Sequence, residues 1–266
     1  MNRIDQTFQQ LRKKGKKAFI AFLTSGDPSL KITEQLVLAF AKNGVDIIEL
    51  GVPFSDPLAD GPTIQAASQR ALNHHVTVSK IFDLVKRIRA HSLIPIVLMT
   101  YYNPVFHFGE EKFFQKAKQV GIDGVIVPDL PPEEGKRLIR FGKKYDLATI
   151  FFLSPTTTLE RLKRIVQAST GFIYYVSVTG VTGERKRLPL EIRDDVSRAK
   201  RWTRKPICVG FGVSTPQQVR SISQMADGVI VGSTIIKEIV KNKGKRDLVN
   251  NVAQYVQRLA KGLNQR

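Results

Sequence analysis

Residues 206–236 read PICVGFGVSTPQQVRSISQMADGVIVGSTII. Two short apolar runs in this stretch, Pro206–Gly210 and Gly228–Gly232, flank a helical pattern over Pro216–Met225. Neither run alternates between apolar and polar residues, which is typical of strands buried on both faces of a parallel sheet. The stretch therefore predicts two parallel strands joined by a helix.

The same pattern recurs toward the N-terminus. Six further apolar runs are predicted to be strands: Ala18–Thr24, Asp46–Gly51, Pro95–Thr100, Gly124–Pro128, Leu147–Leu153 and Phe172–Ser177. The remaining helical patterns cover Ile32–Lys42, Lys80–Ala90, Phe113–Val120, Glu133–Lys143, Leu159–Ala168, Leu190–Trp202 and Ile235–Val240. Eight strand–helix repeats predict an α/β fold, a single (β/α)8 TIM barrel over residues 1–266. A doubly wound open sheet is the structural alternative.

Two additions to a minimal barrel are expected. A helical pattern over Arg3–Lys14 precedes the first strand and would cover the lower end of the barrel. The segment between Gly51 and Pro95 is too long for one helix, so an extra helix is expected at about Thr63–Asn73.

Composition narrows the classes of function. The chain has 42 Lys and Arg against 23 Asp and Glu, a net charge of +19, which attracts anionic ligands and polyanions. The basic residues are spread over many predicted helices without a nucleic-acid-binding motif, which argues against specific nucleic-acid binding. No apolar run reaches the ~18 residues that a membrane span needs. The single cysteine, Cys208, and the absence of a secretory pattern point to the cytoplasm.

The chemistry of a TIM barrel lies in the loops that follow the strands. Glu49 lies within an otherwise apolar predicted strand, where burial raises the pKa of a carboxyl group and suits it to acid–base work. Asp60 lies in the following loop, between two proline-containing turns. A structural glutamate and a turn-forming aspartate are the alternative interpretations.

Glycine-rich segments follow three later strands: SVTGVTG at 177–183, GFGVSTPQQV at 210–219, and GST at 232–234, which opens a helix. Glycine lets backbone N–H groups approach an anion, and a helix N-terminus carries positive partial charge. These segments predict a phosphate site. No cysteine–histidine cluster indicates a metal, and none of the four histidines ends a predicted strand.

The chain resembles the α subunits of tryptophan synthase over essentially its whole length. The segments that carry the resemblance are FLTSGDP (22–28), IIELGVPFSDPLADGPTIQ (47–65), MTYYNPVF (99–106), VPDLPPEE (127–134), SVTGVTG (177–183), VGFGVSTPQQV (209–219) and ADGVIVGS (226–233). The resemblance implies a TIM-barrel lyase that cleaves indole-3-glycerol phosphate by a retro-aldol reaction, for tryptophan biosynthesis. The basic excess, including ERKR at 184–187, departs from the family pattern and puts typical solution behaviour in doubt.

The resemblance also assigns residues. It implies Glu49 and Asp60 as the catalytic pair, with Thr182 orienting the aspartate. The substrate-binding residues that it implies are Phe22, Thr100 and Val127 for the indole ring, Tyr174 in the active site, and Gly183, Gly212, Val213, Gly232 and Ser233 for the phosphate.

The resemblance implies no cofactor in this subunit and a partner β subunit that holds pyridoxal phosphate, in an α2β2 heterotetramer. Loops 53–60 and 101–107 resemble the surfaces that meet the partner. The loop 178–188 is expected to close over the substrate. Two alternatives stay open: a free-standing indole-3-glycerol phosphate lyase, and a non-catalytic phosphate-binding barrel with a regulatory role.

Overall fold

The computed structural model describes residues 1–176, 191–210 and 212–264. Its strands form one sheet in which every neighbouring pair is parallel. The strands are β1 (Ala18–Thr24), β2 (Ile47–Gly51), β3 (Ile96–Met99), β4 (Gly124–Ile126), β5 (Ala148–Ile150), β6 (Phe152–Leu153), β7 (Ile173–Val176), β8 (Ile207–Gly210) and β9 (Gly228–Val231). The expected (β/α)8 barrel is confirmed.

The barrel closes at a strand that is split in two. The sequence predicts one strand over Leu147–Leu153, whereas the structure has β5 and β6 separated by Phe151. β5 pairs with β4 on one side, and β6 pairs with β7 on the other. The backbone N–H of Tyr174 donates to the carbonyl of Phe151, 3.1 Å away, and joins the ring at this point. The open doubly wound sheet is therefore wrong.

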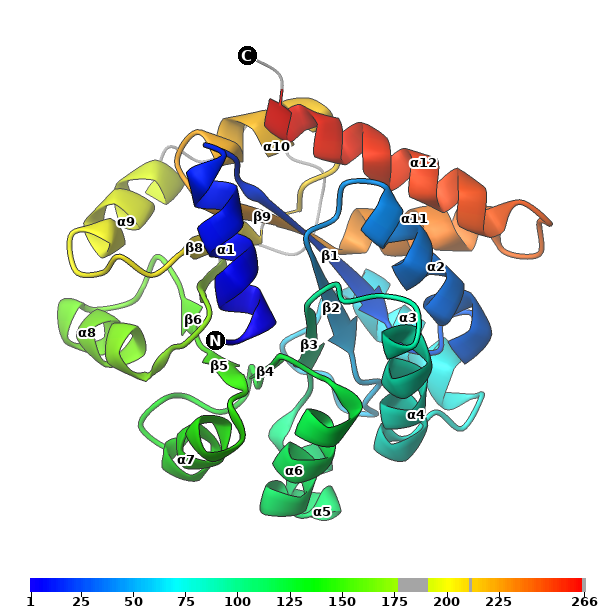
Figure 1. Ribbon diagram of the computed structural model, residues 1–266, viewed down its shortest axis with the longest axis horizontal. Coiled ribbons are helices and arrows are strands. Elements are labelled where there is room, and N and C mark those ends of the chain that lie inside the picture. Colours follow the sequence, from blue (N-terminus) through cyan, green and yellow to red (C-terminus); the bar gives the residue numbers. More distant parts are fainter. Residues whose placement is uncertain (177–190, 211, 265–266) are drawn as a thin grey trace.

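Helices surround the strands (Figure 1). They are α1 (Arg3–Lys13), α2 (Leu30–Lys42), α3 (Pro62–Leu72), α4 (Val78–Arg89), α5 (Tyr102–Phe108), α6 (Glu110–Val120), α7 (Lys136–Tyr145), α8 (Leu159–Ala168), α9 (Glu191–Lys200), α10 (Pro216–Ser223), α11 (Ser233–Asn242) and α12 (Leu248–Ala260), with a 3₁₀ turn at Lys261–Asn264. The two expected extra helices are α1 and α3.

Two helices differ from the sequence prediction. The segment 101–107, expected as a loop, is mostly the short helix α5. The helix start is fixed by a residue distant in sequence, because the side chain of Asp129 accepts hydrogen bonds from the backbone N–H of Tyr102 at the start of this helix. α12 was not expected either, although Leu248, Val252 and Val256 recur at helical spacing and are buried.

Apolar side chains fill two layers, one inside the barrel and one between strands and helices. The inner cluster includes Ile20, Ile47 and Val97, together with Ile4 and Phe8 of α1. α1 therefore covers the lower end of the barrel, as expected. Along β2, residues point alternately inward and outward, so Ile47 and Glu49 share the inner face. In the described part of the chain, no helix has the length and apolar character needed to cross a membrane.

Candidate active site

Glu49 lies on the inner face of β2, next to Phe22 of β1 in the strand register. Its side chain is buried, and neither carboxyl oxygen has a hydrogen-bond partner within the described residues. Burial, assisted by the negative charge of Asp60, raises the pKa of Glu49 to about 8. Glu49 is therefore a neutral acid at pH 7, with a proton to transfer.

Asp60 lies in the loop between β2 and α3, just before the N-cap residue Gly61. Burial raises the pKa of Asp60 to about 6, and a hydrogen bond from Tyr101 acts in the opposite direction. Asp60 is thus ionised at neutral pH beside the protonated Glu49. Two carboxyl groups in opposite protonation states can divide the roles of proton transfer and charge stabilisation.

Tyr101 holds the loop that carries Asp60. Its hydroxyl donates to Oδ2 of Asp60 over 3.1 Å and accepts a hydrogen bond of 2.9 Å from the backbone N–H of Ala59. Tyr101 is also the N-cap residue of α5, so the start of that helix sets the position of its ring. The sequence analysis did not single out Tyr101. The available signal was its place directly after a predicted strand, within MTYYNPVF.

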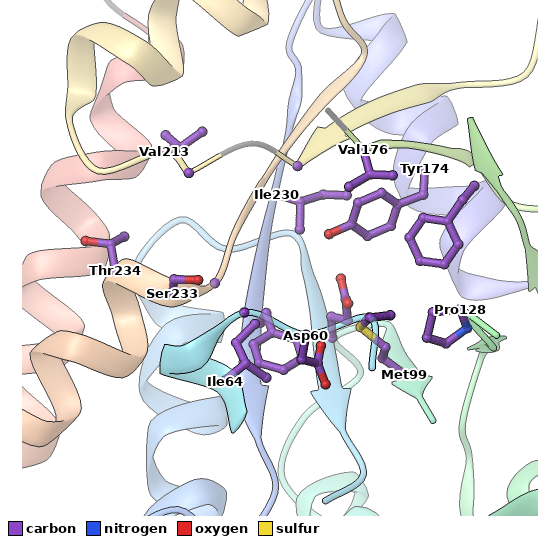
Figure 2. Close-up of a pocket in the computed structure, with 18 of the residues that line it drawn as sticks. Asp60, Ile64, Met99, Pro128, Tyr174, Val176, Val213, Ile230, Ser233 and Thr234 are labelled. Carbon is purple, nitrogen blue, oxygen red and sulfur yellow. The ribbon is translucent and has the colours of Figure 1, made fainter. Parts of the chain in front are cut away.

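Both carboxyl groups line one pocket of about 350 Å³ at the mouth of the barrel. Figure 2 shows Tyr174 and Val176 on one wall, with Asp60, Ile64 and Met99 facing them. The further apolar lining residues include Phe22, Phe152 and Ile230. A flat aromatic ring fits the chemistry of these walls, because apolar side chains predominate there.

Two residues expected in the indole pocket do not line it. Met99 and Pro128 line the pocket, whereas their neighbours Thr100 and Val127 are buried elsewhere. Val127 packs into the cluster between strands and helices. Successive residues along an extended chain face opposite ways, so only one of each pair can point into the barrel.

Tyr174 points into the pocket from β7 (Figure 2). Burial and the negative charges of Glu49 and Asp60 raise the pKa of Tyr174 well above its usual value, so its hydroxyl stays protonated. The ring packs on Phe152, with centroids 4.8 Å apart. A Cβ atom at position 210 would lie 2.6 Å from the hydroxyl oxygen of Tyr174. Glycine at this position therefore leaves the space that the Tyr174 ring occupies.

The other end of the pocket is formed by Gly212, Val213, Gly232 and Ser233, the described residues that the sequence analysis proposes for the phosphate. Gly212 has a φ of 38°, in the left-handed region that favours glycine. Ser233 is the first residue of α11, whose N-cap residue, Gly232, has no side chain to cap the helix. Backbone N–H groups at such a helix N-terminus are suited to an anion.

A cation lies at the same end of the pocket. Lys237 is one turn further along α11 than Ser233 and lines the pocket. Its side chain is exposed and forms no ion pair with the described residues. The sequence analysis missed Lys237, because the spacing of one helical turn from a glycine-rich segment is not a recognised motif.

Two expected site residues, Thr182 and Gly183, lie outside the described residues, as does the whole of the loop 178–188. Among the residues that are described, no group of three or more His, Cys, Asp or Glu side chains could hold a metal ion. The polar groups that line the pocket include two carboxyl groups, the hydroxyl of Tyr174 and the backbone of the anion-binding end.

Comparisons with known proteins agree with this geometry. The family model described as tryptophan synthase alpha chain matches residues 8–264. The chain is 45% identical to the tryptophan synthase alpha chain of Thermoanaerobacter sp. (strain X514), over 97% of this chain and 98% of that one. It is 46% identical to the tryptophan synthase alpha chain of Geotalea daltonii, over 99% of each chain.

Solved structures agree as well. The crystal structure of tryptophan synthase subunit alpha from Legionella pneumophila superposes with a TM-score of 0.92 at 36% identity, over 99% of both chains. A structure of Mycobacterium tuberculosis tryptophan synthase also has a TM-score of 0.92, at 34% identity, over 100% of this chain and 99% of that one. On the family match, the identities and the barrel together, this chain belongs to the family of tryptophan synthase alpha chains.

Proposed function

We propose that Glu49 and Asp60 carry out the reaction of this family in this chain. The reaction is the retro-aldol cleavage of indole-3-glycerol phosphate into indole and glyceraldehyde 3-phosphate, and the chain is a carbon–carbon lyase. One observation supports the assignment of residues above the others. A protonated Glu49 and an ionised Asp60 share an apolar pocket whose far end is suited to an anion.

Glu49 transfers the protons. Its neutral carboxyl group delivers a proton to C3 of the indole ring, which becomes positively charged. The resulting carboxylate then accepts the proton of the glycerol hydroxyl that becomes the aldehyde. As that proton leaves, the bond to C3 breaks, its electron pair returns to the ring, and Glu49 is protonated again.

Asp60 stabilises the positive charge that develops on the ring. An ionised carboxylate near the indole N–H attracts this charge, and the pocket excludes much of the water that would screen it. The hydrogen bonds of Tyr101 hold the loop of Asp60 in place before the substrate arrives, so less reorganisation is needed during the reaction.

The phosphate group binds at the far end, against the backbone N–H groups of Val213 and Ser233. Gly212 and Gly232 allow the backbone to approach the phosphate oxygens closely. A phosphate held at this end leaves the rest of the substrate to extend toward the carboxyl groups, with the indole ring against Phe22 and Ile64.

The alpha chains of this family bind no cofactor, and pyridoxal phosphate belongs to the β subunit. The partner of this chain is a tryptophan synthase β subunit, which receives the indole. A free-standing lyase and a regulatory barrel are not favoured.

The proposal also treats residues 1–266 as one domain, since the described strands share one sheet. It places the chain in the cytoplasm, because its single cysteine suits a reducing compartment.

The test is an assay of indole release from indole-3-glycerol phosphate, with and without the β subunit, beside the variant Glu49→Gln. We expect release by the natural chain, faster with β, and loss of release by the variant. Equal release by both proteins would remove Glu49 from its role, and no release by the natural chain under either condition would overturn the function.

A further inference from the structure

One hydroxyl group behind the anion-binding end of the pocket contacts both of the segments that form it. The Oη atom of Tyr255, on α12, lies 2.5 Å from Oγ1 of Thr234 and 3.4 Å from the backbone oxygen of Ser214. Thr234 belongs to the first turn of α11, and Ser214 belongs to the loop after β8. Both residues line the pocket, whereas Tyr255 does not.

The direction of these two hydrogen bonds follows from the chemistry of the groups. A carbonyl oxygen can only accept, so the hydroxyl of Tyr255 donates to Ser214. Its single proton is then used, and the hydroxyl of Thr234 must donate to the Tyr255 oxygen for both bonds to exist together. One tyrosine hydroxyl therefore links the first turn of α11 to the loop after β8.

We propose that Tyr255 is a positioning residue for phosphate recognition, which sets the separation of the two backbone segments that bind the phosphate. The inference rests on the proposed phosphate site and adds a residue to it from outside the pocket. Tyr255 touches no substrate atom and acts through Ser214 and Thr234.

The two segments need such a link because each contains a glycine. Gly212 has a φ of 38°, and Gly232 has φ −129° and ψ −81°, so neither segment has a regular backbone conformation at the site. N–H groups from two separate segments bind one anion tightly only when their separation is already correct.

α12 is a firm support for this link. Val252 and Val256 of this helix are fully buried, and α12 packs against α11, α10 and α2. The guanidinium group of Arg258 lies 5.7 Å from the centre of the Tyr255 ring and covers it from the same helix. The ring of Tyr255 is thereby held while its hydroxyl contacts the two segments.

The first test is Tyr255→Phe, which removes only the hydroxyl group. We expect KM for indole-3-glycerol phosphate to rise roughly three- to tenfold, the value of one or two neutral hydrogen bonds, with kcat changed less than about twofold. The affinity for inorganic phosphate, used as a probe, should fall by a similar factor. Tyr145→Phe is the matched control, since it removes a hydroxyl that donates to Glu111 and lies outside the pocket.

The second test is a double-mutant cycle with Thr234→Val, which removes the other hydroxyl of the link and preserves the side-chain shape. If Tyr255 acts through Thr234, Tyr255→Phe should raise KM by a smaller factor in the Thr234→Val background than in the natural chain. Independent, multiplying effects of the two substitutions would overturn the proposal.

A purely structural role is separable from a positioning role. A fall in melting temperature for Tyr255→Phe with unchanged KM and unchanged phosphate affinity would overturn the inference and leave the proposed function intact. Failure of the proposed function would show differently, as absent indole release or absent phosphate binding by the natural chain itself.

Discussion

The charge on Asp60 raises the pKa of Glu49, although the two residues lie in different elements, one in β2 and the other in the loop before α3. Burial is the larger cause of the shift, and the neighbouring carboxylate adds to it. Tyr101 acts in the opposite direction on Asp60, because its hydroxyl donates to the ionised form. The site therefore separates the two pKa values to about 8 and about 6.

This separation predicts a bell-shaped dependence of kcat/KM on pH. Asp60 must be ionised, so activity should fall as the pH drops through about 6. Glu49 must be protonated, so activity should also fall as the pH rises through about 8. Steady-state rates across both limbs measure this directly. Asp60→Asn should lose the acidic limb, and a flat profile in the natural chain would contradict the protonation states.

Glu49→Gln should lower kcat by roughly 10²–10⁴, the usual contribution of a general acid–base group. The amide preserves the shape of the side chain but has no proton to transfer, so the substrate should still bind. Single-turnover rates together with a substrate-binding measurement separate the two effects. Retention of more than about a tenth of the natural activity would contradict this role.

The same variant should change the dependence of stability on pH. The unfolded chain releases the Glu49 proton near pH 4.5, whereas the folded chain keeps it up to about 8. Between these values the native state binds more protons, so the natural chain loses stability as the pH rises, by about 3 kcal/mol at pH 7. Denaturant unfolding at several pH values should show this loss in the natural chain and not in Glu49→Gln. Parallel curves would contradict the raised pKa.

The sequence predicts the barrel and singles out Glu49 because both depend on local patterns, whereas the pairing of Glu49 with Asp60 is implied by the family resemblance. Continuous apolar runs signal strands buried on two faces, and a carboxyl group inside such a run stands out. Tyr101 could not be predicted in the same way, because its function depends on where α5 begins, and a carboxylate distant in sequence, Asp129, caps that start. Met99 and Pro128 were missed for a different reason, since a shift of one residue along a strand reverses the face.

Asp60→Asn should abolish most turnover and leave the fold intact. A neutral amide cannot stabilise positive charge on the indole ring, although it can still accept the hydrogen bond from Tyr101. The loop should keep its place, because its other contact with Tyr101 runs through the backbone of Ala59. Circular dichroism and thermal unfolding beside the activity assay decide the outcome. Unfolding of the variant would show that Asp60 serves mainly to form the turn.

Gly212→Val should raise KM at least about tenfold, while Ser233→Ala should change KM little. A β-branched residue is strained at the φ of 38° that Gly212 adopts, so the neighbouring N–H groups would move. Ser233 is expected to contribute its backbone N–H, which alanine preserves. KM values and inorganic phosphate affinity of both variants provide the measurement. A substrate-soaked crystal with the phosphate bound elsewhere would contradict the assignment.

Lys237→Gln should raise KM roughly two- to fivefold at low salt without changing kcat, because an exposed cation near an anion contributes little more than this. Lys237 lines the anion-binding end and has no acidic partner within the described residues, so its charge is available to the substrate. Dissolved ions screen exposed charges beyond about 10 Å at 0.1 M salt, so the difference in KM should shrink as salt is added. Lys241→Gln is the matched control, one helical turn further along α11, outside the pocket and paired with Glu238. An equal effect of Lys241→Gln would show that Lys237 acts through the general basic charge of the chain and not at the phosphate. A salt-independent effect would contradict an electrostatic role of Lys237.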